Sequence, residues 1–241
     1  MRILILAVGL FGASSPALAQ DPAAQAKNWK NAAELTVLNT TGNSRVTTYG
    51  ASDLFTATRG KASAEVKGGA LGSKTQGTTT AEQYNAGEKV SWALSERYYV
   101  FERFGWDKNR FAGIRNRYEP SAGLGALAIK TPKDTLAAEL GAGYVSEERI
   151  GSPSKSFASG RAYAKYAHVF NEAVNFSQDA EYLRDFSDGR NYRLNTETAF
   201  ISAMSTHLSL KASYKWKRVN APPLGFVKDD TFTALALIVN Y

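Results

Sequence analysis

The feature that most constrains this fold is a strict alternation of apolar and polar residues. Between Leu208 and Lys217 one parity holds Leu, Leu, Ala, Tyr and Trp, whereas the other holds Ser, Lys, Ser, Lys and Lys. Successive side chains of a β-strand point to opposite faces, so this segment has one apolar wall and one charged wall. A helix cannot gather the same residues into a continuous apolar stripe. The segment is therefore predicted to be a strand.

The same alternation recurs along the chain and predicts about twelve strands. They are expected at residues 31–39, 45–58, 62–73, 81–94, 98–107, 117–129, 135–147, 157–170, 173–185, 192–204, 208–218 and 230–241. Most are longer than the roughly 5–6 residues of typical globular strands, and they suit a tilted membrane span of about 9–11 residues. The pattern favours an all-β fold, an antiparallel transmembrane β-barrel, over its main rival, a soluble periplasmic sandwich.

The connections between these strands also favour a barrel. Short connections alternate with longer ones, which are expected at 74–80, 108–116, 148–156, 186–191 and 219–229, with an intermediate one at 40–44. Outer-membrane barrels have short periplasmic turns and longer external loops. Aromatic residues such as Trp92, Tyr98 and Trp106 fall toward strand ends, as in the interfacial girdles of these barrels.

The first 19 residues have the pattern of a signal peptide. Arg2 provides the positive region, residues 3–11 form a short apolar core, and small residues precede a cleavage site predicted between Ala19 and Gln20. The apolar run is shorter than the about 20 residues of a membrane-spanning helix, which argues against the alternative of an N-terminal anchor. We expect a signal peptide at 1–19, a short segment at 20–28 and the barrel at 29–241.

Composition narrows the class of function. The formal net charge of +7 falls only to +6 when Arg2 is removed with the signal peptide. Basic charge suits nucleic acid or anionic lipid, and export argues against a nucleic-acid partner. The chain has no cysteine, so disulfides and a lipid attached to a processed N-terminal cysteine are excluded. The expected location is the bacterial outer membrane.

Several segments are familiar as a set. They are the stretch 94–113 (LSERYYVFERFGWDKNRFAG), Tyr118, and the runs 121–125, 139–144, 40–43 and 80–84. Together they resemble a bacterial family of unknown function whose members are often called salt-induced outer membrane proteins. The resemblance covers about residues 29–241, implies an outer-membrane β-barrel and brings no agreed activity or catalytic residue. The alternation up to the terminal Tyr241 is similar to the assembly signal of such barrels, which implies the barrel-assembly machinery as a partner.

No catalytic or metal site is predicted, and no cofactor is expected. His207 and Ser209 have the spacing that some outer-membrane lipid hydrolases use, but they are expected at a periplasmic turn, and no orienting group or oxyanion site is indicated. His168, expected on the apolar wall, has no serine two residues away. The acidic pair Asp229 and Asp230 flanks a strand start and lacks further metal ligands. We expect no enzyme and keep a lipid hydrolase as the minor alternative.

Two groups of charged residues are candidate sites. The first is basic and external, and its arginines suit phosphate groups of lipopolysaccharide, although a solvated loop is the alternative; it comprises Lys108, Arg110, Arg115 and Arg117. The second faces the lumen and comprises Lys67, Lys89, Arg103, Arg161, Lys165, Arg193, Lys211, Lys215, Lys217, Glu65, Glu139, Asp179, Glu181 and Glu197. Opposite charges in the lumen can pair across neighbouring strands, and the excess of cations would favour anions in transit.

The expected function follows from the predicted size of the barrel. Barrels of about 8 strands are filled by side chains and those of about 16–18 leave an aqueous channel, so about 12 strands lie between these cases. We expect an outer-membrane barrel that forms a narrow passive channel for small solutes. The alternative is a non-conducting structural barrel that binds lipopolysaccharide or other partners.

Overall fold

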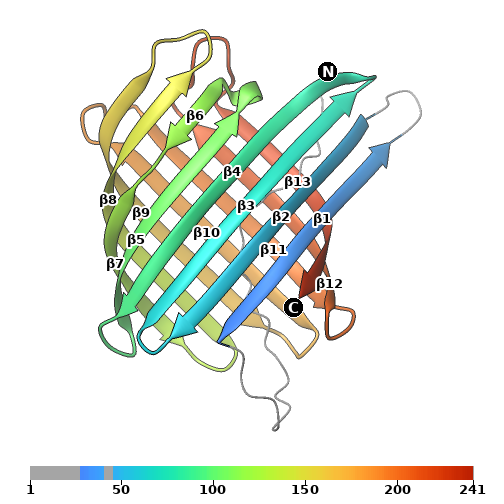
Figure 1. Ribbon diagram of the computed structural model, residues 1–241, viewed down its shortest axis with the longest axis vertical. Helices are drawn as coiled ribbons and strands as arrows, with labels where there is room; N and C mark the ends of the chain where they lie inside the picture. Colours follow the sequence, from blue (N-terminus) through green and yellow to red (C-terminus); the bar gives the residue numbers. More distant parts are fainter. Residues whose placement is uncertain (1–27, 41–45, 241) are drawn as a thin grey trace.

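The computed structural model describes residues 28–40 and 46–240, which form a barrel of antiparallel strands (Figure 1). The strands are β1 (Trp29–Thr40), β2 (Val46–Arg59), β3 (Ala62–Thr75), β4 (Thr78–Ala93), β5 (Tyr98–Asn109), β6 (Ile114–Tyr118), β7 (Ser121–Lys130), β8 (Asp134–Arg149), β9 (Lys155–Val169), β10 (Val174–Asp185), β11 (Tyr192–Ala203), β12 (Leu208–Val219) and β13 (Asp229–Asn240). A single turn of 3-10 helix, η1 (Arg110–Ala112), lies between β5 and β6. No helix in the described ranges is long and apolar enough to cross a membrane.

The sheet closes on itself, and its ends meet where β1 pairs with β13. β6 and β7 share one position in the barrel, because both pair with β5 on one side and with β8 on the other. The break between them falls at Glu119 and Pro120, since proline has no N–H to donate to the ladder. The barrel therefore has twelve strand positions, which confirms the predicted fold class.

Alternation along each strand produces the two predicted walls, and β12 shows this clearly. Lys211 and Lys215 are 1% and 5% exposed, whereas Leu210 and Tyr214 are 44% and 48% exposed. The charged parity therefore lies inside the barrel, and the apolar parity lies outside. A soluble protein of this kind would hide the apolar parity, so the arrangement is that of a barrel with an apolar environment.

The connections at the two ends differ in length, with one correction to the prediction. The prediction of a long connection at 74–80 is wrong. The strands β3 and β4 extend into this segment, and only Gln76 and Gly77 join them. Both residues have positive φ, 50° and 85°, as in the two-residue turns that match the twist of a hairpin. The connections 110–113, 150–154, 186–191 and 220–228 are longer and lie at the same end (Figure 1). The connection 41–45 lies outside the described residues.

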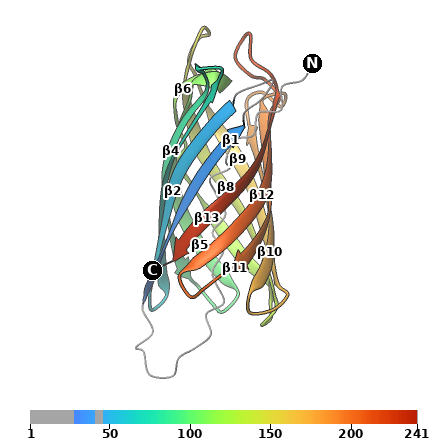
Figure 2. The ribbon, with the colours of Figure 1, turned by 90° about the vertical axis from the view of Figure 1, so that its right-hand side faces the viewer.

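The barrel is flattened, being wide in Figure 1 and narrow in the perpendicular view of Figure 2. Leu71 on β3 packs against Ala234 and Phe232 on β13, although β1 and β2 separate these strands in the sheet. Elsewhere the Tyr99 ring enters the interior, and Gly125 on β7 makes room for it. A Cβ atom at Gly125 would lie 2.1 Å from the Tyr99 Cζ. Side chains therefore narrow the lumen from several strands.

Candidate functional site: the charged lumen

A cavity of about 450 Å³ runs along the inside of the barrel. Pro222 and Pro223, in the connection between β12 and β13, line it at the end with the longer loops. Ala32, near the start of β1, and Asn240, at the end of β13, line it toward the other end. The cavity thus extends from the long loops toward the short turns.

The cavity collects most of the charged residues that the alternation assigned to the lumen. Twelve of the fourteen line it, namely Lys67, Lys89, Arg103, Arg161, Lys165, Arg193, Lys215, Lys217, Glu65, Glu139, Asp179 and Glu181. The other two, Lys211 and Glu197, are buried in the same wall. The Lys211 Nζ lies 3.0 Å from Glu197 Oε1 and 3.2 Å from an oxygen of Glu34.

Glu139 on β8 is the acceptor at the centre of the largest cluster. Its side chain is only 1% exposed. It accepts hydrogen bonds from the Lys89 Nζ, from the Tyr99 hydroxyl at 2.8 Å and from the Arg161 Nη1 at 2.8 Å. The Arg161 Nε also donates to Glu181 at 2.5 Å. Buried charges require such partners, because an isolated charge would lose its hydration without compensation.

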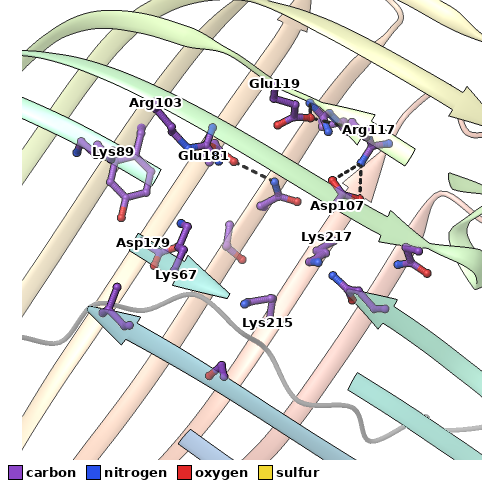
Figure 3. A pocket seen from close by; sticks show the side chains of 18 of the residues that line it. Lys67, Lys89, Arg103, Asp107, Arg117, Glu119, Asp179, Glu181, Lys215 and Lys217 are labelled. Carbon is purple, nitrogen blue, oxygen red and sulfur yellow. Dashed lines mark hydrogen bonds and ion pairs between the residues drawn. The ribbon is translucent and has the colours of Figure 1, made fainter. Parts of the chain in front are cut away.

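Among the described residues, three ion pairs cross the interior between strands that two or more other strand positions separate in the sheet. They join Lys89 on β4 to Glu139 on β8, Arg103 on β5 to Glu181 on β10, and Arg193 on β11 to Glu119 beside β6. The Arg103 Nη1 to Glu181 Oε1 distance is 3.6 Å. Figure 3 shows Lys89, Arg103, Glu119 and Glu181 of these pairs pointing into the space between the walls. The pairs occupy part of the cross-section, while Lys67, Lys165, Lys215 and Lys217 line the cavity from other strands.

Arg117 corrects the prediction of an external basic cluster. It is only 8% exposed and lines the cavity rather than the outer surface. Its guanidinium lies 2.9 Å from Glu147, 3.3 Å from Asp107 and 3.7 Å from Glu119 (Figure 3 shows the pair with Asp107). The pairing of β6 shifts register between Ile114 and Asn116. After this irregularity Arg117 has the parity of the residues that point into the barrel.

The remaining members of the predicted basic cluster lie at the end with the long loops. Arg110 in η1 is 67% exposed at its side chain and lies 3.6 Å from Glu82. Arg115 is exposed, and the Lys108 Nζ lies 5.7 Å from the centre of the Tyr84 ring. These three cations therefore stay outside the lumen, whereas Arg117 does not.

The two histidines lie in different surroundings. The His168 Nδ1 lies 2.7 Å from Asp134 Oδ1, which also accepts from the Tyr166 hydroxyl. His207 is exposed in the turn after β11, whereas Ser209 is buried and lies 3.4 Å from the Asn240 amide nitrogen. Within the described ranges, no group of three or more residues could hold a metal ion.

Sequence reasoning missed carboxylates that change the charge of the lumen. Glu34, Asp107, Glu119 and Asp230 also line the cavity, and Glu147 is buried beside Arg117. Glu34, Asp107 and Asp230 have the inward parity of their strands, and Glu119 has the parity of Ser121 in β7, so alternation could have revealed all four. With these residues the lining has no large excess of either sign, so the expected cation excess is wrong.

Comparison with known proteins places the chain in a family. Residues 33–241 match the family described as "Protein of unknown function, DUF481". The chain belongs to the DUF481 family. YdiY, an uncharacterized protein of Escherichia coli strain K12, is 24% identical over 228 residues, which cover 92% of this chain and 89% of YdiY. The family match itself covers almost the whole barrel.

Solved structures similar to this DUF481 protein are outer-membrane barrels. A NanC porin structure superposes with a TM-score of 0.52 at 10% identity, over 88% of this chain and 97% of that one. The COG4313 outer membrane channel from Pseudomonas putida F1 gives 0.52 at 10% identity, over 92% of this chain and 100% of that one. At such identities the likeness concerns the fold. The closed barrel and these neighbours place the protein in the bacterial outer membrane, in contact with its lipids.

The membrane location makes two outward carboxylates unusual. Glu88 on β4 lies opposite Phe104 and Val66, and Glu102 on β5 lies opposite Val90; these three apolar partners are 40%, 51% and 40% exposed. Glu102 is midway along β5 between the outward rings of Tyr98 and Trp106. Both carboxylates are exposed and follow the outward, apolar parity of their strands.

We expect replacement of Glu102 by leucine to raise the free energy of unfolding by about 1–2 kcal/mol, because charged residues destabilise the lipid face near mid-depth. Urea-dependent unfolding of the protein refolded in lipid vesicles measures this change. The control is Glu96→Leu in the exposed connection after β4, which should change stability by less than about 0.5 kcal/mol. A loss of stability in Glu102→Leu would instead mean that the carboxylate binds a partner.

Proposed function

We propose that this DUF481 barrel is a narrow passive channel for small polar solutes. The observation that carries the proposal is the cavity of about 450 Å³ that extends from Pro222 and Pro223 to Ala32 and Asn240. Its lining is rich in ionised and amide side chains, which can replace water around a polar solute. The barrel of twelve positions is intermediate between side-chain-filled and open barrels, and the crossing ion pairs make it a narrow member of this range.

The distribution of charge suggests little preference for ions of one sign. Lysines and arginines alternate with carboxylates around the lining, and Asn195 and Gln83 add neutral polar groups. A lumen with mixed signs produces no large single-sign field, which is what concentrates counter-ions in selective pores. We therefore assign the channel to small polar solutes as a class. The porin and the channel with similar folds support this proposal at the level of fold alone.

Planar-bilayer recording of the purified, refolded protein tests the proposal. We expect small discrete conductance steps, and a reversal potential near zero in a gradient of potassium chloride, because the lining has no large excess of charge. Folded protein is recognised by heat-modifiable migration on a gel, and heat-denatured protein is the control. Folded protein that produces no steps would rule out the channel and favour the non-conducting barrel.

A second candidate function rests on three cations at the end with the long loops, of which Arg110 and Arg115 are exposed and Lys108 is half-buried. Lys108, Arg110 and Arg115 would contact lipopolysaccharide phosphates, as positive side chains bind phosphate oxygens. Native mass measurement compares the protein with a variant in which all three are replaced by glutamine. The candidate predicts weaker lipopolysaccharide binding by the variant, and equal binding would eliminate it. Recognition of Tyr241 by the barrel-assembly machinery and cleavage after Ala19 stay proposals, since both lie outside the described residues.

A further inference from the structure

The connection between β12 and β13, residues 220–228, reaches across the mouth of the barrel. We call it the strap. β12 and β13 lie on the opposite side of the strand order from β5 and β6. Nevertheless, a Cβ atom placed on Gly113, just before β6, would lie 2.6 Å from the Phe226 ring and 3.0 Å from Pro223 Cγ. The strap is therefore seated on the far rim.

A second contact holds the strap to a third part of the rim. The Leu224 N–H donates to the Ser152 Oγ at 3.1 Å, in the connection between β8 and β9. At its base, the Val219 N–H donates to the Lys228 carbonyl at 2.8 Å. The strap thus joins the β12–β13 side of the barrel to the connections after η1 and after β8.

The internal structure of the strap limits its freedom. Pro222 and Pro223 have fixed φ, and the Phe226 N–H donates to the Pro223 carbonyl at 3.2 Å to close a turn. Gly225 has a φ of 86°, which this turn requires. Pro223 is buried, and Pro222, Pro223 and Val227 line the cavity from above. The strap therefore has a defined conformation and covers the end of the lumen.

We propose that the strap is the size filter of the external mouth, with Phe226 and Pro223 seated on Gly113 as the residues that hold it in place. This inference rests on the proposed channel function. It adds the place in the barrel at which solutes are selected by size. Small solutes pass through the gaps beside the strap, whereas bulky molecules are stopped before they reach the charged lumen. Gly113 matters because any side chain there would displace the Phe226 ring.

Access of thiol reagents to a lumen cysteine tests the size filter without relying on conductance. The natural chain has no cysteine, so Asn195→Cys adds one reactive group in the cavity lining. Protein in sealed vesicles is treated from the loop side with a small maleimide or with a maleimide carrying a polyethylene glycol chain. Three further variants are made in this background: residues 222–227 replaced by Gly-Ser-Gly, Phe226→Ala, and Leu224→Ser.

The strap replacement is expected to raise the labelling rate of the bulky reagent several-fold and to change that of the small reagent little. Phe226→Ala should show a smaller increase in the same direction, because it removes the ring seated on Gly113 and leaves the chain length unchanged. Leu224→Ser is the matched control, since this side chain is 86% exposed. Heat-modifiable migration on a gel identifies folded samples. If the variant with the replaced strap does not fold, the labelling rates of Phe226→Ala test the inference.

The outcomes separate this inference from the proposed function. Bulky-reagent rates that are equal in the parent and the strap variants would overturn the size filter, even if the parent conducts. A rise in bulky labelling would support the filter even if the parent produces no conductance, and the channel function alone would then fail.

Discussion

Replacement of Glu139 by alanine is expected to lower the free energy of unfolding by about 3–5 kcal/mol, since removal of one partner leaves the others as uncompensated buried charges. Its carboxylate is 1% exposed and binds Lys89, Tyr99 and Arg161. Urea-dependent unfolding of the barrel in lipid vesicles measures the loss. Glu139→Gln should lose less, because it keeps the shape and one acceptor while removing the charge.

The matched control for this prediction is Glu148→Ala on the same strand. Glu148 is exposed near the long loops and accepts one hydrogen bond from Asn116 at 2.8 Å. Its replacement should change stability by less than about 0.5 kcal/mol, as is usual for surface positions. Equal effects of the two substitutions would mean that the cluster around Glu139 is hydrated and contributes little.

The second prediction concerns the ion pairs that cross the interior. The double variant Arg103→Ala and Arg193→Ala is expected to raise single-channel conductance and to shift the reversal potential toward cation preference. Two bulky cations leave the cross-section, while Glu181 and Glu119 remain in it. The barrel should still fold, because Glu181 keeps Arg161 at 2.5 Å and Glu119 keeps Arg117 at 3.7 Å.

Arg218→Ala is the control for the crossing pairs. Arg218 lies at the exposed end of β12, where its Nη1 is 2.8 Å from Asp229, outside the cavity lining. Its loss should leave conductance and reversal potential unchanged. If the double variant behaves like this control, the crossing pairs do not limit passage and the pathway lies elsewhere.

Much of the barrel could be predicted because strand side chains alternate with a period of two. In β12, this period separates Lys211, Lys215 and Lys217 from the outward Leu210 and Tyr214, whatever the neighbouring strands are. The prediction that Arg117 lies outside with Arg110 and Arg115 was wrong, because it assigned Arg117 to a loop cluster. Arg117 belongs to β6, which at this point pairs with β5 and β8 in the same register as β7, so Arg117 shares the inward parity of Ser121.

The prediction of a long connection at 74–80 was also wrong. Its polar residues resemble a loop, yet they continue β3 and β4 because Gln76 and Gly77 can form the hairpin turn alone. Backbone pairing with a neighbouring strand outweighs local composition in such a segment. Of the missed carboxylates, only Glu119 lies beside Pro120, whereas Glu34, Asp107 and Asp230 lie inside regular strands and follow the same alternation as the other lumen residues.

The sequence by itself determined which residues of most regular strands face inward and that the barrel has about twelve strand positions, because both follow from local periodicity. Only the tertiary structure decided which charges meet, since Arg103 and Glu181, or Arg193 and Glu119, come from strands that are distant in the sheet. It also decided that the strap rests on Gly113. Those contacts depend on the closure and flattening of the barrel, and no local pattern in the chain encodes the distance across its lumen.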